Sequence, residues 1–467
     1  MKNLNVTSSM KCPPYVEKYL KRHGDTRWTL SSLPHEPVES VESVIVIPAL
    51  AERDNLFQTI LSLVRNEAFD LASVLLLCVI NNKPAGIAPR QDIENNMETM
   101  CFLNYLSRFA NNTNIPDAIL TSGEVEEIRK SNFNITYVDA SSAGKELPPK
   151  GGVGLARKIG MDLALTTLDY EKQGPSLIVC LDADTLTDEN YLLEISRYFR
   201  ETKREVALLS FSHVLPQERR RLSAIACYEI FLRYYRLGLK YAGTPYAFHT
   251  IGSTMVCTAK SYTAIGGMNT KEAGEDFYFL QKLAKYSAIG EIKNTTVYPS
   301  ARVSDRVPFG TGRKMKELDA SGEAFFPFYD PRSFQILRDF VATIKGAVNE
   351  GVSEGEPILD KCRVIEPLLA DFLEARNFAS VWGKIEKNSP NKEKLLRSFH
   401  EWFDAFTILK LIHYLRDNGF IERGMFQAVS GLMARMNLKF PFNEADGENC
   451  EKAVELLQYM RSLEKSL

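Results

Sequence analysis

Three uninterrupted apolar runs stand out in the first two hundred residues, at Val41–Leu50, Ala72–Ile80 and Leu177–Leu181. Runs of this length, rich in valine, isoleucine and leucine, predict strands that are buried on both faces, as in a parallel sheet. Between the first two runs, Glu52–Asn66 repeats apolar residues at helical spacing and predicts a helix. The order strand, helix, strand therefore predicts a parallel sheet with right-handed crossovers.

Further along the chain the pattern continues, and then it changes. More strands are expected at Phe133–Ala140, Val206–Phe211 and Thr250–Cys257, and more helices at Glu94–Ala110, Leu155–Leu168, Glu189–Glu201, Glu218–Leu239 and Phe277–Tyr286. From about residue 331 only helical periodicity remains, at Phe334–Val348, Leu359–Glu374 and Leu395–Asp417. We expect an N-terminal arm over 1–40, an α/β domain over 41–325 with a mainly parallel sheet flanked by helices, and an all-α domain over 326–467.

Composition narrows the class of protein. Among 467 residues, 45% are hydrophobic and 25% charged, with a net charge of −2, so no basic field favours nucleic acid as a partner. Eight cysteines without C-x-x-C pairs favour a reducing compartment and no zinc site. Neither a signal-peptide core nor a run long enough to span a bilayer is found in the sequence. These features predict a cytoplasmic protein without a transmembrane segment.

Two carboxylates follow the third apolar run directly, in Asp182-Ala183-Asp184. In an extended chain, side chains two residues apart face the same side, so the two acids would repel each other unless a cation lay between them. Mg²⁺ and Mn²⁺ prefer such oxygen ligands and share them with a diphosphate. The alternative is a simple strand-to-helix turn in which Asp184 or Thr185 caps the helix.

Polar residues end all three predicted strands, at Pro48–Glu52, Asn81–Lys83 and Asp182–Asp184. Ligands of parallel sheets bind beyond the carboxyl ends of the strands, so these ends should line one site. The glycine-rich loop Ser141–Gly154 runs into a helix whose first turn carries Arg157 and Lys158, where a phosphate is attracted. A flexible connector with solvated basic residues is the alternative.

Five segments in this order resemble a known family. They are VIVIPALAE (44–52), GGVGLARKIGMDLA (151–164), LDADT (181–185), IGSTMVCTAKSYTAIGGMN (251–269) and GEDFYF (274–279). Together they resemble a family 2-type glycosyltransferase with a GT-A fold, of the nucleotide-diphospho-sugar transferase superfamily. The resemblance covers roughly residues 41 to 315.

The resemblance implies a donor site. Pro48 to Glu52 would line the nucleotide pocket, with Glu52 near the ribose or base. Asn82 stands where the family often has a base-reading aspartate, and Arg157 matches the arginine that approaches the diphosphate. Asp182 and Asp184 match the pair that binds the ribose and the metal-diphosphate, which implies Mg²⁺ or Mn²⁺ as cofactor.

The resemblance also implies the chemistry. Glu275 and Asp276 match the family's E-D pair, of which Asp276 would be the catalytic base, and Gly252 and Ser253 would lie near the acceptor. A carboxylate that takes the proton of an attacking hydroxyl makes it a nucleophile, and in-line attack inverts the anomeric centre. A helix N-terminus with a favourable dipole contact is the alternative for Glu275 and Asp276.

Departures from the family pattern leave several points open. Lys158 replaces an asparagine, and Asn81-Asn82 replaces an acidic pair. No histidine follows the E-D helix as a metal ligand, and Asp305 is the only carboxylate in the segment 297–315. Arginines of that segment suggest either a loop over the diphosphate, a site for an anionic acceptor or a basic surface loop; they are Arg302, Arg306 and Arg313. His249, before a strand, is expected to be structural.

The sequence therefore predicts a metal-dependent glycosyltransferase that moves a sugar from a nucleotide-diphosphate donor to a hydroxyl acceptor with inversion. A retaining transferase, a nucleotidyltransferase on the same scaffold and a non-catalytic nucleotide-sugar-binding scaffold protein remain alternatives. A homo-oligomer is compatible with the sequence, which does not define the acceptor, the base or the role of the helical domain.

Overall fold

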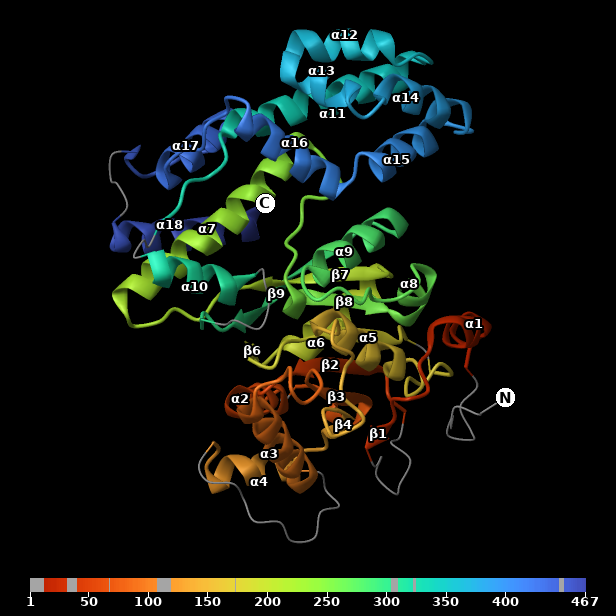
Figure 1. The fold of residues 1–467 in the computed structure, drawn as a ribbon, viewed down its shortest axis with the longest axis vertical. Coiled ribbons are helices and arrows are strands. Elements are labelled where there is room, and N and C mark those ends of the chain that lie inside the picture. Colours follow the sequence, from red (N-terminus) through yellow and green to blue (C-terminus); the bar gives the residue numbers. More distant parts are fainter. Residues whose placement is uncertain are drawn as a thin grey trace. The chain divides into compact units, whose positions relative to one another are not determined.

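The computed structural model describes residues 12–31, 40–66, 68–106, 119–172, 174–303, 310–321, 325–444 and 449–467. Within these ranges the chain forms two compact units (Figure 1). The first contains residues up to 214 and residues 250–300, and the second contains residues 215–249 and those from 311 onward. The division groups 215–249 with the C-terminal helices, whereas the sequence suggested a single boundary near residue 325.

The first unit is built on one nine-stranded sheet, with strand order β1-β4-β3-β2-β5-β8-β7-β9-β6. Its strands are β1 (Leu30–Ser31), β2 (Ser43–Ala49), β3 (Val74–Asn81), β4 (Asn134–Ala140), β5 (Leu177–Cys180), β6 (Thr185–Thr187), β7 (Val206–Phe211), β8 (Met255–Thr258) and β9 (Gly290–Pro299). The pairs β4–β3, β3–β2, β2–β5 and β7–β9 are parallel, and the other pairs are antiparallel. The predicted α/β class is confirmed, with the parallel pairing concentrated in the part of the sheet that the three apolar runs predicted.

Helices of the first unit pack on this sheet. They are α1 (Pro14–His23), α2 (Arg53–Val64), α3 (Arg90–Leu106), α4 (Ser122–Lys130), α5 (Val153–Ala164), α6 (Tyr191–Thr202), α8 (Ala259–Ala264) and α9 (Glu275–Tyr286), with 3-10 turns η1 (Leu71–Ser73) and η2 (Gly252–Thr254). Helix α5 lies so close to β2 that a Cβ at Gly160 would stand 2.4 Å from Val46 Cγ1. A larger residue would push the helix off the sheet.

The predicted N-terminal arm contributes α1 to the first unit. Asp162 of α5, which is 7% exposed, accepts hydrogen bonds from Tyr19 of α1 (2.8 Å) and from Tyr262 of α8 (2.6 Å). Lys158 of α5 contacts the same carboxylate and donates to the carbonyl of His23 (3.2 Å). Because a buried carboxylate needs such partners, this cluster fastens α1 to the helix that carries Arg157.

The second unit is all-helical in the part that the structure describes, apart from an isolated bridge between Phe328 and Arg423. Its helices are α7 (Arg219–Ala242), α10 (Thr311–Ser321), α11 (Pro331–Glu350), α12 (Glu356–Ile365), α13 (Pro367–Glu374), α14 (Phe378–Lys387), α15 (Lys392–Trp402), α16 (Ala405–Asp417), α17 (Met425–Arg435) and α18 (Cys450–Ser466). Pro367 divides the helix expected over Leu359–Glu374, because proline lacks the N–H that continues a helix and restricts the residue before it. Nowhere among the described residues is a helix both long and apolar enough to cross a membrane.

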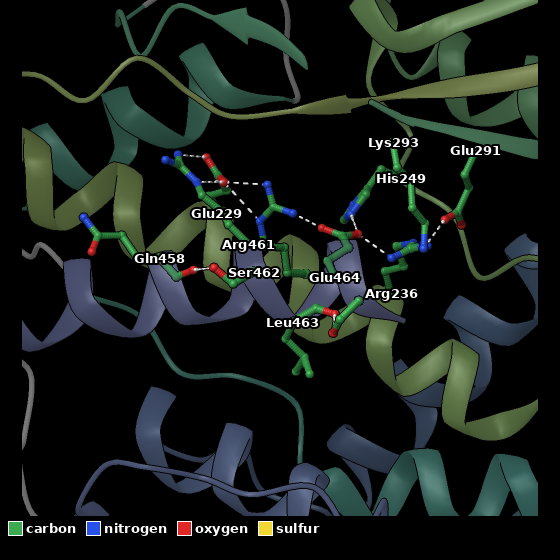
Figure 2. A network of polar contacts seen from close by, with 12 residues as sticks. Glu229, Arg236, His249, Glu291, Lys293, Gln458, Arg461, Ser462, Leu463 and Glu464 are labelled. Atoms are coloured by element: carbon green, nitrogen blue, oxygen red, sulfur yellow. Dashed lines mark hydrogen bonds and ion pairs between the residues drawn. The ribbon is translucent and has the colours of Figure 1, made fainter. Parts of the chain in front are cut away.

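A buried ionic network joins α7 to α18 in the second unit (Figure 2). Glu229, which is fully buried, receives Arg461 through two bonds of 2.7 and 2.8 Å and Arg233 through bonds of 2.7 and 3.0 Å. Glu464 holds Arg233, Arg236 and the ring of His249, the last at 2.6 Å. We call these six residues the helical ion cluster. The expectation that His249 is structural is confirmed.

Candidate functional site

The chain turns sharply where β5 ends. The carbonyl of Asp182 accepts the N–H of Thr185 at 3.2 Å, and buried Thr59 donates its hydroxyl to the carbonyl of Ala183 at 2.9 Å. The two acids are therefore in a turn rather than in the extended chain that the sequence suggested. The alternative of a cap is also wrong, because the turn leads into β6, and α6 has Asn190 as its N-cap. Both carboxylates remain half-buried beyond the carboxyl end of β5.

Arg157 gathers the predicted segments into one site. Arg157 is 2% exposed, and its guanidinium contacts Asp182 Oδ1 through Nη2, Glu275 Oε1 through Nε at 3.1 Å, and the Gly252 carbonyl through Nη1 at 3.4 Å. Burial alone would lower the pKa of Arg157, but the carboxylates of Asp182 and Glu275 outweigh burial and raise it. The residue is a fixed cation held by three segments distant in sequence.

Residues of η2 complete the shell around Asp182. Ser253, fully buried, donates its hydroxyl to Asp182 Oδ2 at 2.5 Å and lies 3.0 Å from the hydroxyl of Thr185. A Cβ at Gly252 would stand 2.1 Å from Arg157 Nη2, so only glycine lets the guanidinium lie there. The expected strand over Thr250–Cys257 thus begins as a 3-10 turn, which presents the Gly252 carbonyl and the Ser253 hydroxyl to the site. The acceptor role of both residues stays a prediction.

Glycines at the junction between the glycine-rich loop and α5 let another segment of the chain pack closely against them. A Cβ at Gly154 would stand 2.4 Å from the carbonyl oxygen of Lys271, and one at Gly152 would stand 2.7 Å from Glu272 Cα. The absence of these side chains lets the segment that leads into α9 lie on the start of α5. This approach brings Glu275 to Arg157.

Glu275 and Asp276 form the first turn of α9, after Gly274 in the left-handed region at φ 65°. Glu275 is 5% exposed, and its carbonyl accepts a hydrogen bond from the Asn269 amide at 2.8 Å. Asp276 Oδ1 accepts the N–H of Phe277 at 2.7 Å. Burial, and next the charge of Glu275, raise the pKa of Asp276 to about 8. A carboxyl group with such a pKa exchanges a proton near neutral pH, as a general base must.

Lys158 does not face this site. Its ammonium group contacts Asp162 and lies 3.4 Å from the Tyr19 hydroxyl and 5.7 Å from the centre of the Tyr19 ring. Side chains at neighbouring positions of a helix point in different directions, and here Arg157 points to the site while Lys158 points to α1. The expectation that both basic residues face a phosphate is wrong for Lys158.

The predicted nucleotide-pocket residues lie at the ends of β2 and β3. Pro48 is in β2, opposite Val79 of β3, and Glu52 follows as a 7% exposed side chain whose Oε2 accepts the Asn55 amide at 3.0 Å. Asn82 is 1% exposed, and its amide nitrogen donates to the carbonyls of Lys83 (2.8 Å) and Ser141 (3.3 Å). In this conformation Asn82 fixes the backbone, and its role in base reading stays a prediction.

Sequence reasoning did not identify Asn96, a 1% exposed residue of α3 that bonds to the ends of both strands. Its amide nitrogen donates to the Asn81 carbonyl (3.0 Å) and to Asn82 Oδ1 (2.9 Å), and its oxygen accepts the N–H of Ala51 (2.9 Å). A polar residue in a segment of helical periodicity is ordinarily read as surface. The only signal was its neighbour Asn95, which makes a pair of asparagines in α3.

The arginines that follow β9 lie in the second unit where the structure describes them. Arg313 lies in α10 of the second unit, 44% exposed, with Glu317 at 3.2 Å. Arg302 immediately follows Ala301 in that unit and is half-buried. Asp305 and Arg306 lie outside the described residues. The diphosphate-covering and anionic-acceptor roles of this segment remain predictions.

The donor set at Asp182 and Asp184 suits a hard divalent cation that is shared with a ligand. Within the described ranges no three acidic, histidine or cysteine residues converge on one metal position. If both carboxylates ligated Mg²⁺, several positions of the six-coordinate ion would be left for phosphate oxygens and water.

Comparisons with known proteins bear on this site. Residues 177–327 match the model of "Glycosyl transferase family group 2", which includes the turn at Asp182, η2 and the E-D pair. No curated protein matches the sequence.

Solved structures give distant similarities. One is S. aureus TarS 1–349 in complex with UDP-GlcNAc, 12% identical over 87% of this chain and 95% of that chain, with a TM-score of 0.36. Another is the mannosyltransferase PcManGT from Pyrobaculum calidifontis in complex with GDP-Man and Mn²⁺, 12% identical over 86% and 90% of the two chains, with a TM-score of 0.34. Similarities this distant say nothing about the ligands of this chain. The family match instead confirms the resemblance over residues 177–327, which contain three of its five segments: this part of the protein is a glycosyltransferase segment of family group 2.

Proposed function

We propose that the protein transfers a sugar from a nucleotide-diphosphate donor to a hydroxyl group of an acceptor, with a divalent metal and with inversion of the anomeric centre. The observation that carries this proposal is the contact of Arg157 with both Asp182 and Glu275. It unites the three sequence segments to which the resemblance assigns the diphosphate, the metal and the base.

The charge of these residues supports a metal. The five motif residues contribute four carboxyl groups and one guanidinium; they are Arg157, Asp182, Asp184, Glu275 and Asp276. Two of these carboxyl groups, those of Asp182 and Glu275, contact the guanidinium. A donor diphosphate brings further negative charge, so binding requires an added cation. Asp182 and Asp184 would hold it, and when bound it would neutralise the charge that grows on the diphosphate as leaving group.

Asp276 has the properties of the base. Its raised pKa of about 8 gives it affinity for the proton of an attacking hydroxyl, which an ordinary carboxylate lacks. Arg157 and Glu275 orient the site: the guanidinium holds Asp182 for the donor, and Glu275 holds the guanidinium. The charge of Glu275 also raises the pKa of its neighbour. The site thus combines donor binding with a proton acceptor.

The first experiment measures thermal stabilisation by UDP, GDP, ADP and CDP, each with and without Mn²⁺ or Mg²⁺. A ligand that binds only the native state raises the melting temperature by mass action. We expect a metal-dependent rise with one base and its loss in Asp184→Ala. No rise with any nucleotide would remove the proposed donor site, and an unchanged metal dependence in Asp184→Ala would remove the metal assignment.

Product analysis separates the remaining alternatives. An anomeric configuration opposite to that of the donor supports direct attack with Asp276 as base, whereas retention supports a retaining transferase. Release of pyrophosphate supports a nucleotidyltransferase. Binding of the sugar nucleotide without turnover over a broad panel of hydroxyl acceptors would favour a scaffold protein.

A further inference from the structure

The loop between β2 and α2 contains an uncommon backbone conformation. Ala51 has φ 52°, in the left-handed region where a Cβ crowds the backbone. The loop sequence Ala49-Leu50-Ala51-Glu52 offers no glycine to relieve this crowding. A non-glycine residue stays in this region only when its surroundings hold it there, and such residues concentrate at ligand-binding sites.

Asparagine side chains hold this loop at three points. The Asn81 amide donates to the Ala49 carbonyl (3.2 Å), Asn96 Oδ1 accepts the Ala51 N–H (2.9 Å), and Asn95 Oδ1 accepts the Arg53 N–H (3.1 Å). The last two come from consecutive residues of α3. The backbone on both sides of Glu52 is therefore fixed by one helix.

Asn96 is the central member of this set. At 1% exposed it uses its amide oxygen for Ala51 and its amide nitrogen for the Asn81 carbonyl and for Asn82 Oδ1. One side chain thus ties the ends of two neighbouring parallel strands. An amide supplies both a donor and an acceptor, so neither aspartate nor alanine reproduces these bonds.

We propose that Asn96, assisted by Asn95, is a positioning residue for the nucleotide of the donor. Asn96 holds Ala51 in its left-handed conformation, so that the Ala49–Glu52 loop is already ordered when the nucleotide binds. Ordering a loop before binding removes an entropic cost from the binding step. This inference rests on the proposed function, because it assigns the loop to the nucleotide of that reaction.

The test compares nucleotide affinities of variants by titration calorimetry, with the member of the UDP, GDP, ADP and CDP panel that binds the unaltered protein in Mn²⁺. Asn96→Ala should weaken binding about tenfold, the loss typical of one buried hydrogen bond. Asn104→Ala, on the same helix at an exposed position, should leave affinity unchanged.

Rescue distinguishes positioning from a general structural role. Ala51→Gly removes the Cβ, and glycine adopts a positive φ without strain but orders the loop less than Asn96 does, so the Ala51→Gly/Asn96→Ala double variant should recover part of the lost affinity. The added Ala51→Gly substitution neither fills the space left by the Asn96 amide nor restores the bonds of Asn96 to the two strand ends. Recovery would therefore not come from repair of a general structural defect. No recovery in the double variant would overturn the proposal, as would unchanged affinity in a folded Asn96→Ala.

Two further outcomes are decisive. If Asn96→Ala does not fold, Asn95→Ala replaces it with an expected loss of about threefold, and unchanged affinity there overturns the proposal. If the unaltered protein binds none of the nucleotides, the proposed function itself fails. A protein that binds a nucleotide equally well without Asn96 contradicts this inference alone.

Discussion

The molecule contains two buried arginine networks that resemble each other locally and differ in charge and exposure. At the candidate site, one arginine lies between two acids, and Asp182 keeps 32% of its side chain exposed. In the helical ion cluster, three arginines and a histidine surround two glutamates, and the ion-paired side chains of Arg233 and Glu229 are 5% and 0% exposed.

The pKa values of Arg157 and Arg233, one from each network, are shifted in opposite directions. Acidic neighbours raise the pKa of Arg157 against the effect of burial, whereas burial lowers the pKa of Arg233, beside which Arg461 and Arg236 add like charge. A surplus of acid that reaches solvent can accept a metal ion or a proton. A closed network between two helices fixes their packing. Ion pairing alone therefore does not identify a functional site.

The largest effect is expected from a substitution that removes the proposed base of the candidate site. Asp276→Asn removes the proposed base and should lower kcat by about 10³-fold, the usual contribution of a general base. The affinity for the nucleotide and the melting temperature should not fall, because amide and acid have the same shape. The exposed Asp360→Asn should leave kcat unchanged. Steady-state kinetics with the proposed donor measures both, and full turnover by Asp276→Asn would refute the base assignment.

The next effect breaks the other network. Glu229→Gln removes one carboxylate from buried Arg233, which keeps Glu464, and from half-buried Arg461. It should lower the free energy of unfolding by about 3 kcal/mol. Denaturant unfolding measures this loss. Glu451→Gln is the matched control, because Glu451 of α18 is 73% exposed and pairs with Arg219, and it should cost less than about 1 kcal/mol. Equal losses in the two variants would show that burial does not govern the strength of these pairs.

A third variant tests the close approach at Gly252. Alanine would bring a Cβ to 2.1 Å from Arg157 Nη2, so the guanidinium must move away from Asp182. A displacement of this kind should lower kcat/KM on the order of 10²-fold. Gly346→Ala is the control: a Cβ at this position of α11 would have no atom within 4 Å, so alanine should stabilise the protein by about 0.5 kcal/mol. Normal kinetics in Gly252→Ala would mean that Arg157 does not position the donor.

The sequence predicted those parts of the first unit that local pattern encodes. Apolar runs gave β2, β3 and β5, and motif order gave the residues that Arg157 brings together. It missed β9, because GEIKNTTVYP mixes polar and apolar residues. This strand instead depends on distant partners: β7 pairs with it across an irregularity after Leu209, and the Asp188 carboxylate accepts the Thr296 N–H at 2.8 Å.

Long-range contacts account for the other differences at the site. The direction of Lys158 depends on its contacts with Tyr19 and His23 at α1. The turn at Asp182 is held by Thr59, which bonds to the Ala183 carbonyl from 124 residues away. Asn96 acts on backbone groups 45 and 15 residues away, at Ala51 and Asn81. No spacing rule reaches such partners, because tertiary contacts decide where a polar side chain is satisfied.

The smallest expected effect is the pH dependence of kcat/KM, which should come from the candidate site and not from the helical ion cluster. Asp276 must be ionised to accept a proton, and its pKa is raised to about 8 by burial and by Glu275, so kcat/KM should rise about tenfold per pH unit below that value. This rise in kcat/KM reflects ionisation of Asp276 in the free enzyme, so it should be absent from the pH profile of the residual activity of Asp276→Asn. A flat profile between about pH 6 and 8 would contradict the base assignment.

Stability should depend on pH in the opposite sense. Folded Asp276 keeps its proton where the unfolded carboxyl, with an ordinary value of 3.8, has lost it. Its contribution to stability is therefore complete below that value and declines as pH rises toward about 8. Asp276→Asn should remove this decline, while Glu229→Gln should keep it. A variant pair that behaved otherwise would place the titrating group outside the candidate site.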